Sequence, residues 1–161
     1  MAFRQVSLEK NLLIVGPPDT GKTTVLRGLP VFADVLYMDL EDPLFVNDVL
    51  RKPEFINEVL NDVATGEWLA INRLDRILKY LPLIKEHIQN RQIRIAATVS
   101  SLDSFKDTDL FHFQVCSNLN LSQIQNSVNL SNIIHFGALP KVYNLEKDTD
   151  KIRYLKNYVQ D

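Results

Sequence analysis

The stretch that decides the fold is GPPDTGKT at positions 16–23, which matches the pattern GxxxxGK[ST] in full. It follows an apolar run, NLLIV at 11–15, that is typical of a strand buried on both faces in a parallel sheet. The residues after it, 23–27, have the pattern of a short helix that stops at Gly28 and Pro30. A strand, this loop and a helix in that order are the context that a phosphate-binding P-loop requires.

The residue types in this loop each suit the binding of phosphate. Small residues at positions 16 and 21 let successive backbone N–H groups turn inward around a β-phosphate. Lys22 is predicted to reach β- and γ-phosphate oxygens as a point charge, and the Thr23 hydroxyl is predicted to be a ligand of Mg²⁺. The predicted nucleotide-binding residues are Gly16, Pro17, Pro18, Asp19, Thr20, Gly21, Lys22, Thr23 and Thr24.

Apolar runs and helical patterns alternate along the rest of the chain. Further strands are predicted at 35–40, 67–72, 91–98 and 111–115. Helices are predicted over 55–63, from Pro82 to Ile88, from Ser122 onward and around 152–159. Strands that alternate with helices predict an α/β fold, namely a P-loop NTPase with a parallel, doubly wound sheet flanked by helices.

The length and composition fit one globular domain. The chain has 161 residues, of which 45% are hydrophobic and 24% charged, so a disordered chain is excluded. We expect a single P-loop nucleotide-binding domain over 1–161, with the final helix either ending it or starting a second domain. Residues 110–140 carry no charged side chain, which is typical of a semi-buried edge or of a surface for a protein partner or oligomer.

Several classes of partner and site receive no support from the sequence. The net charge is −2 and no run rich in Lys or Arg occurs, so nothing indicates an electrostatic nucleic-acid or membrane partner. The single cysteine, Cys116, excludes an intramolecular disulfide and a Cys-based zinc site. The three histidines, His87, His112 and His135, lack metal-ligand spacing. Since no apolar run is long enough for a membrane span or a signal peptide, we expect a cytoplasmic protein.

Classes of P-loop protein differ in the polar residues that accompany the loop. The NKxD element of a GTPase is matched only superficially at 72–75, because Arg73 replaces its lysine and no DxxG element intervenes. A small-molecule kinase would use an acidic pair after the second strand, where Asp39 or Glu41 would bind Mg²⁺ or an acceptor hydroxyl. An arginine-rich lid, which such kinases carry, is not visible in the second half of the chain. The remaining class is the ATPase, whose third strand ends in an acidic Walker B pair.

The order of the motifs resembles that of prokaryotic AAA-type ATPases in which a P-loop domain precedes a C-terminal domain of uncharacterised function. The matching segments are GPPDTGKTTVLRGLP at 16–30, LYMDLEDP at 36–43, WLAIN at 68–72, ATVSS at 97–101 and FGALPKVYNL at 136–145. In that order they resemble the Walker A segment, the second strand, the Walker B strand, the sensor strand and the GGLP-containing end of the ATPase domain. The resemblance covers most of the chain and implies ATP and Mg²⁺ as ligands.

The chain departs from that family at positions that serve hydrolysis. Asn72 and Arg73 stand where the family has Asp-Glu, and neither can act as a general base. Val99 stands where the sensor usually has a glycine, which leaves Thr98 and Ser100 as its polar contacts. We therefore expect an AAA-like domain that binds Mg²⁺ and ATP with weak or absent ATP hydrolysis.

Three alternatives stay open at this point. An active ATPase would need a displaced acid, for which Asp75, Asp39 and Glu41 are the candidates. A small-molecule P-loop kinase would use the acidic residues after the second strand. A structural module with a vestigial P-loop would bind no nucleotide.

Overall fold

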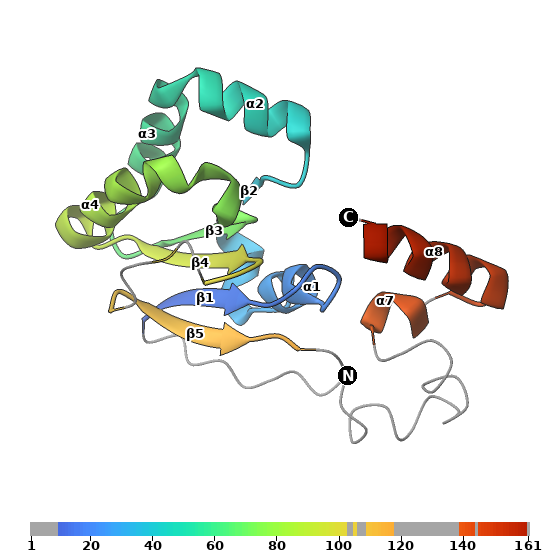
Figure 1. Cartoon of the computed structure of the whole chain (residues 1–161). Helices are drawn as coiled ribbons and strands as arrows, with labels where there is room; N and C mark the ends of the chain where they lie inside the picture. The colour runs from blue at the N-terminus through green and yellow to red at the C-terminus, as the bar shows by residue number, and fades with distance from the viewer. Residues whose placement is uncertain (1–9, 103–104, 106–108, 118–138, 144, 161) are drawn as a thin grey trace.

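A sheet of five parallel strands in the order β2-β3-β4-β1-β5 forms the centre of the molecule (Figure 1). The strands are β1 (Asn11–Val15), β2 (Leu36–Asp39), β3 (Trp68–Asn72), β4 (Arg94–Val99) and β5 (Phe111–Val115). This computed structural model describes residues 10–102, 105, 109–117, 139–143 and 145–160. The predicted α/β class, a parallel sheet flanked by helices, is confirmed.

Prolines and one aspartate determine where several helices begin. The helical segments are α1 (Lys22–Arg27), η1 (Pro30–Asp34), α2 (Pro43–Arg51), α3 (Pro53–Asp62), η2 (Leu74–Tyr80), α4 (Leu81–Arg91), α7 (Pro140–Tyr143) and α8 (Asp148–Gln160), where η denotes a 3-10 helix. The Asp42 side chain caps α2 by accepting a hydrogen bond from the Leu44 N–H at 2.9 Å. Pro43 occupies the first position of α2, where the missing N–H costs nothing.

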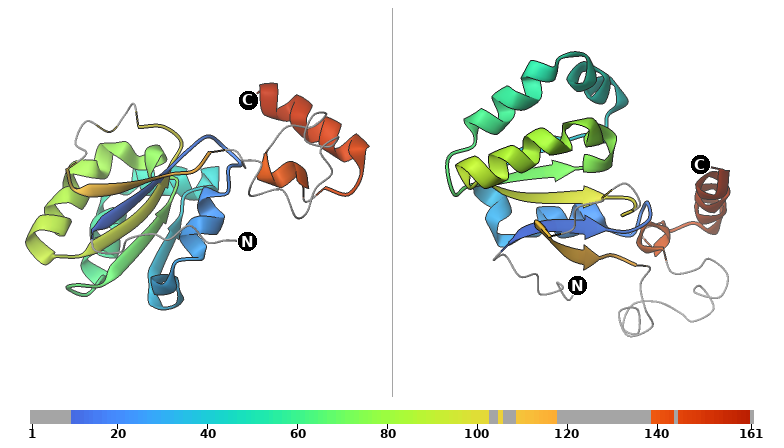
Figure 2. Two further views of the ribbon diagram at one scale, coloured as in Figure 1. Left: turned by 90° about the horizontal axis from the view of Figure 1, so that it is seen from below. Right: turned by 60° about the vertical axis from the view of Figure 1, so that its left-hand side comes forward.

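Helices cover both faces of the sheet, which explains why its central strands are continuous apolar runs (Figure 2). Every residue of β1 and of β3 is buried. On one face, Leu13 belongs to a hydrophobic cluster that includes Ile56 of α3 and Ile84 of α4. On the other face, Leu12 belongs to a second cluster that includes Leu26 of α1. The alternation of side chains along β1 therefore serves two cores at once.

The structure differs from the sequence-based prediction at several elements, since η1, η2 and α7 were not predicted, and two further differences concern β4 and α2. The strand predicted at 91–98 begins only at Arg94, because α4 precedes it and Gln92 ends that helix in a left-handed conformation with φ of 54°. The sequence pattern does not predict α2, which buries only Val46 and Val49 among its nine residues. Both differences concern short segments, in which the apolar residues repeat too few times to indicate the type or the bounds of an element.

Some sequence-based predictions fall on parts of the chain that are not described. The helix predicted to open at Ser122 lies outside the described residues, as does most of the uncharged segment 110–140. Among the described residues, no helix is both long enough and apolar enough to cross a membrane. The same part of the chain holds no group of three or more His, Cys, Asp or Glu side chains suited to a metal ion.

The carboxyl ends of the strands meet at one edge of the sheet, the edge at which parallel sheets collect their functional groups. The P-loop, residues 16–23, follows β1 there, Asn72 ends β3, and Ser100 follows β4. The last elements of the chain, α7 and α8, lie beyond the same edge (Figures 1 and 2). Residues from both ends of the described chain therefore approach the P-loop.

Gly16, the first residue of the P-loop, lies against the end of β5. A Cβ atom at this position would lie 2.0 Å from the Cys116 carbonyl oxygen, while the Cys116 N–H donates to the Val15 carbonyl at 2.6 Å. We expect Gly16→Ala to force β5 away from β1 and to lower the free energy of unfolding by about 1–3 kcal/mol, the usual cost of overpacking. Urea denaturation followed by circular dichroism measures this change.

The matched control is Gly28→Ala. Gly28 ends α1 with φ of −84°, a conformation that alanine adopts without strain, so this variant should stay as stable as the wild type or become slightly more stable. Equal urea midpoints for Gly16→Ala and the wild type would contradict the close approach of β5.

Candidate functional site

The P-loop has the backbone conformations that an anion-binding loop needs. Gly21 has φ of 85° and Asp19 has φ of 58°, so both lie in the left-handed region between right-handed or extended neighbours. Such alternation turns backbone N–H groups toward one point and creates a concavity for an anion. The Thr20 hydroxyl donates to the Pro17 carbonyl at 2.8 Å and so closes the loop on itself. The sequence-predicted phosphate loop is thus formed as one local unit.

Lys22 is buried at the base of this loop, with 6% of its surface exposed. Its ammonium group donates to the Pro17 carbonyl at 2.5 Å. Burial lowers the pKa of Lys22 below its ordinary value, and the nearby positive charge of Arg73 lowers it further. The negative charge of a phosphate group in the loop would act in the opposite direction, because it favours the charged form of the buried ammonium.

The end of β3 is joined to the P-loop by a buried amide. The Asn72 side chain is completely buried, and its Oδ1 accepts hydrogen bonds from the Thr23 hydroxyl at 3.1 Å and from the Thr98 hydroxyl at 2.7 Å. Thr98 is also fully buried and accepts a hydrogen bond from the Arg73 backbone N–H at 2.8 Å. Residues of α1, β3 and β4 therefore meet around one amide oxygen beside the P-loop.

Asp39, at the end of β2, completes this network. Asp39 lies directly opposite Asn72 in the pairing of β2 with β3, and the Asn72 Nδ2 donates to its Oδ1 at 2.9 Å. The other carboxylate oxygen accepts hydrogen bonds from Tyr37 at 2.9 Å and from Arg27 at 3.4 Å. Burial acts to raise the pKa of Asp39, but the bonds from Asn72 and from the Glu41 N–H outweigh it, so the pKa lies below its ordinary value.

Arg73 follows Asn72 and forms an ion pair with a second carboxylate, that of Asp75. Its backbone has φ of 64°, and its guanidinium donates to both oxygens of Asp75, at 3.3 and 3.2 Å. Both side chains of this pair are mostly buried, with 25% and 21% exposed. Asp75, a candidate for a displaced acid, is therefore held as the partner of a cation.

The three candidate acids occupy different places relative to the P-loop. Asp39 is part of the network around Asn72, whereas Asp75 lies in the ion pair with Arg73. Glu41 is exposed and donates its backbone N–H to Asp39 at 3.1 Å. Sequence reasoning missed the contact between Asp39 and Asn72, because only the strand order β2-β3 brings the two residues together.

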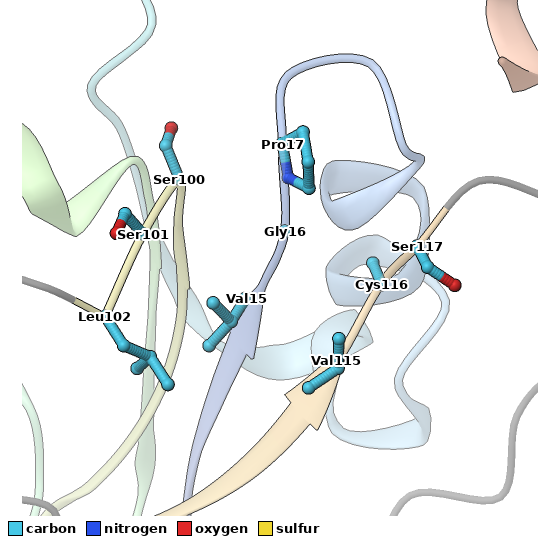
Figure 3. Close-up of a pocket in the computed structure, with 9 residues that line it drawn as sticks. All are labelled: Val15, Gly16, Pro17, Ser100, Ser101, Leu102, Val115, Cys116 and Ser117. Carbon is cyan, nitrogen blue, oxygen red and sulfur yellow. The ribbon is translucent and has the colours of Figure 1, made fainter.

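A pocket of about 590 Å³ opens beside the P-loop, between the ends of β4, β1 and β5 (Figure 3). Its walls come from residues 15–17, 100–102 and 115–117. The Ser100 Oγ is buried and has no hydrogen-bond partner within the described parts of the chain. Ser100, expected as a polar contact of the sensor strand, therefore adjoins the loop without a bond to it.

Known proteins resemble this chain over parts of their length. No protein-family model matches it. The ATPase subunit HslU of an ATP-dependent protease from Nitrobacter hamburgensis is 29% identical over 107 residues, which are 65% of this chain and 25% of that protein. Among solved structures, a DNA replication initiation factor matches with a TM-score of 0.52 and 17% identity, over 96% of this chain and 55% of that one. The structure of C. elegans PCH-2 matches with a TM-score of 0.47 and 16% identity, over 78% of this chain and 44% of that one.

The fold is that of an AAA-type P-loop NTPase. The chain spans a quarter of the length of the curated relative and about half of the replication factor.

The C-terminal elements of the described chain contact the P-loop through Asp19. The Tyr154 hydroxyl of α8 donates to one carboxylate oxygen of Asp19, and the Lys141 ammonium of α7 lies 3.6 Å from the other. The Lys141 ammonium also lies over the Tyr154 ring, 5.3 Å from its centre. Burial, together with the bond to Asp19, raises the pKa of Tyr154 above its ordinary value. Sequence reasoning found the final helix but not this contact.

The contact between Tyr154 and Asp19 should hold α8 in place. Removal of the hydroxyl in Tyr154→Phe costs a partly exposed hydrogen bond to a carboxylate, about 0.5–1.5 kcal/mol. We expect amide hydrogen exchange in α8 to become roughly three- to tenfold faster, while exchange in β1 stays unchanged.

Tyr158→Phe is the matched control for this variant. The Tyr158 hydroxyl lies one helical turn further along α8 and makes a longer, exposed contact of 3.4 Å with the Pro18 carbonyl. Its loss should change exchange in α8 by less than the loss of the Tyr154 hydroxyl. Identical exchange in Tyr154→Phe and the wild type would refute an anchoring role for Tyr154.

Proposed function

We propose that this domain binds ATP together with Mg²⁺ and hydrolyses it slowly or not at all. The observation that carries the proposal is the end of β3, where a neutral amide contacts Thr23 and the next residue is a cation. The P-loop supports binding, whereas the residues after β3 do not support general-base catalysis.

Binding is supported by the charge of the P-loop. Lys22 is a buried cation with a lowered pKa, and the charge of Arg73 lies near enough to contribute to that lowering. A polyphosphate bound to the backbone N–H groups of the loop would compensate this positive charge. The proposed base, adenine, comes from the sequence resemblance and from HslU, which is described as an ATPase.

The residues around Thr23 suit a magnesium ion. Because the Thr23 hydroxyl directs its proton to Asn72 Oδ1, the lone pairs of its oxygen are left for a cation. Mg²⁺ prefers oxygen ligands and keeps several waters, so one hydroxyl together with phosphate oxygens is a typical protein contribution. When bound, Mg²⁺ neutralises charge on the β- and γ-phosphates. We therefore assign Thr23 as the protein's magnesium ligand.

Slow hydrolysis is supported by the described residues, in which none of the candidate acids is placed as a free base beside the P-loop. Asn72 is neutral, and Arg73 carries the wrong charge to accept a proton from water. Asp75 is neutralised by Arg73, and Glu41 is exposed. Asp39, the remaining acid, already accepts hydrogen bonds on both carboxylate oxygens.

The main competing proposal is an active ATPase that uses Asp39 as its acid. The observation that favours it is that Asp39 contacts Asn72, and the same Asn72 side chain contacts Thr23. A small-molecule kinase is distinguished by ATP consumption that depends on an added acceptor. We further propose a cytoplasmic setting, with which the single, buried cysteine of the sequence, Cys116, agrees.

Lys22→Ala should weaken ATP binding. The variant removes a charge-assisted contact with phosphate, worth about 1.5–3 kcal/mol, so the affinity should fall at least tenfold. Calorimetric titration with ATP measures the change. Lys52→Ala, which removes an exposed lysine between α2 and α3, is the matched control and should bind as the wild type does. Equal affinities of Lys22→Ala and the wild type would exclude binding at the P-loop.

A carboxylate pair restored after β3 should increase hydrolysis. The structure adds one requirement, because an aspartate at position 72 would face Asp39 and be repelled by it. The variant is therefore Asn72→Asp with Arg73→Glu and Asp39→Asn. One positioned base contributes about 10²- to 10⁴-fold, so phosphate release should rise well above that of the wild type while ATP affinity changes by a few-fold.

Phosphate release is measured over a range of protein concentrations, because a neighbouring subunit that supplies an arginine would make the rate depend on concentration. The wild type should turn over well below about 1 s⁻¹, the low end of common enzyme rates. An ordinary rate in the wild type that disappears in Asp39→Asn would support the active ATPase instead. The same ordinary rate in Asp39→Asn would leave Asp75 and Glu41 as the acids to test.

A further inference from the structure

The Asn72 side chain has two ends of similar shape and opposite hydrogen-bonding character. Its carbonyl end accepts hydrogen bonds, and its NH₂ end donates them. The end that faces Thr23 decides whether the magnesium side of the P-loop meets an oxygen or an N–H group. The orientation of this one buried amide therefore matters for the binding of a cation.

One neighbour determines this orientation, and a second one is satisfied by it. The Asp39 carboxylate can only accept, so Asn72 must present its NH₂ group to it. The Asn72 Oδ1 then faces Thr98 and Thr23 and accepts a hydrogen bond from each hydroxyl. The Thr98 hydroxyl, which also accepts from the Arg73 N–H, could donate to or accept from an amide, so it adapts to the orientation that Asp39 sets.

Asp39 is itself held firmly. Its Oδ1 accepts from the Glu41 N–H as well as from Asn72, and its Oδ2 accepts from Tyr37 and Arg27. A carboxylate offers about four acceptor positions, so these four donors use its capacity. Asp39 is therefore not placed to act as a direct ligand, and its effect on the site passes through the Asn72 amide.

We propose that Asp39 is a positioning residue for the magnesium site, which holds the Asn72 amide so that its oxygen faces Thr23 and the metal. The inference rests on the proposed function and extends it to a pair of residues, Asp39 and Asn72, that together replace a Walker B carboxylate. Metal-binding histidines are oriented by carboxylates in a comparable way. With Mg²⁺ held by Thr23, the negative charge of Asp39 would act from one side chain further away than a Walker B carboxylate, and it would polarise the amide oxygen through the hydrogen bond.

The competing explanation is that Asp39 serves only as the partner of Arg27 in an exposed ion pair. Its contact with Arg27 is 3.4 Å long, and the two side chains are 36% and 55% exposed. Such pairs contribute little to stability. The 2.9 Å bond to a fully buried amide is the contact that sets Asp39 apart from a surface aspartate.

The test compares ATP affinity with Mg²⁺ and with EDTA, by calorimetric titration. The ratio of the two dissociation constants is the metal effect. Asp39→Asn keeps the size of the side chain and removes its charge. We expect the metal effect to fall by about tenfold, which is the lower end for partners of metal ligands. In EDTA the affinity for ATP should stay equal or increase, because a negative charge has been removed near a polyanion.

A metal effect that falls while the affinity in EDTA does not fall separates a positioning role from a structural one. A loss of packing would weaken ATP binding in EDTA and in Mg²⁺ alike, and that result would overturn the proposal. An unchanged metal effect in Asp39→Asn would overturn it as well. Failure of the wild type to bind ATP in either buffer is a different result, because it would reject the proposed function itself.

Two control variants calibrate the measurement. Thr23→Ala removes the magnesium ligand and should abolish most of the metal effect. Asp62→Asn removes an exposed carboxylate at the end of α3, toward the amino end of β3 and away from the P-loop, and should leave both affinities unchanged.

An exchange of the two side chains keeps the test valid if Asp39→Asn does not fold. In Asp39→Asn with Asn72→Asp, the carboxylate faces Thr23 and the amide at position 39 donates to it, so the hydrogen bond is kept with its direction reversed. We expect this variant to retain the metal effect of the wild type or to exceed it. Loss of the metal effect in the exchanged pair, with folding shown by circular dichroism, would contradict the proposal.

Discussion

The pairing of β2 with β3 in one register brings Asp39 opposite Asn72, and the arrangement of the whole site depends on this contact. A shift of β2 by one residue would turn the Asp39 side chain to the opposite face of the sheet, away from Asn72. The same shift in β3 would turn the Asn72 side chain away from Thr23, and the P-loop would lose its link to the centre of the sheet.

The charges around the P-loop favour the binding of an anion and disfavour catalysis by a carboxylate. Lys22 is buried with a lowered pKa. The negative charge of a bound polyphosphate would stabilise the charged form of this ammonium group, and the ammonium would stabilise the polyphosphate in turn. The carboxylates of Asp39, Asp75 and Asp19 are each held by donors or cations. A general base needs a free lone pair directed at the reacting water, and carboxylates held in this way do not offer one.

Asp19 gives the P-loop a connection to the end of the chain. Its backbone adopts a φ of 58°, a conformation for which glycine has no steric cost, yet the loop carries an aspartate there. Both oxygens of that aspartate are used, one by Tyr154 and one by Lys141. The side chain therefore serves α7 and α8 instead of the phosphate site, and it joins the position of these helices to the conformation of the loop.

The sequence by itself determined the P-loop, because its residues are contiguous and their types set the backbone conformation locally. It also determined the α/β class, since buried parallel strands are apolar runs between helices. The helix α2 and the start of β4 at Arg94 were not predictable in the same way, because short segments carry little periodicity. The sequence left Asp39, Asp75 and Glu41 equivalent as candidate acids.

Only the tertiary structure separated these three acids, and the reason is the order of the strands. Parallel strands have the same apolar pattern wherever they stand in a sheet, so periodicity does not reveal that β2 lies beside β3 and β3 beside β4. That order brings Asp39, Asn72 and Thr98 together from three separate segments. The contact of Tyr154 with Asp19, across most of the chain, likewise depends on where the fold places the last helix and not on any local pattern.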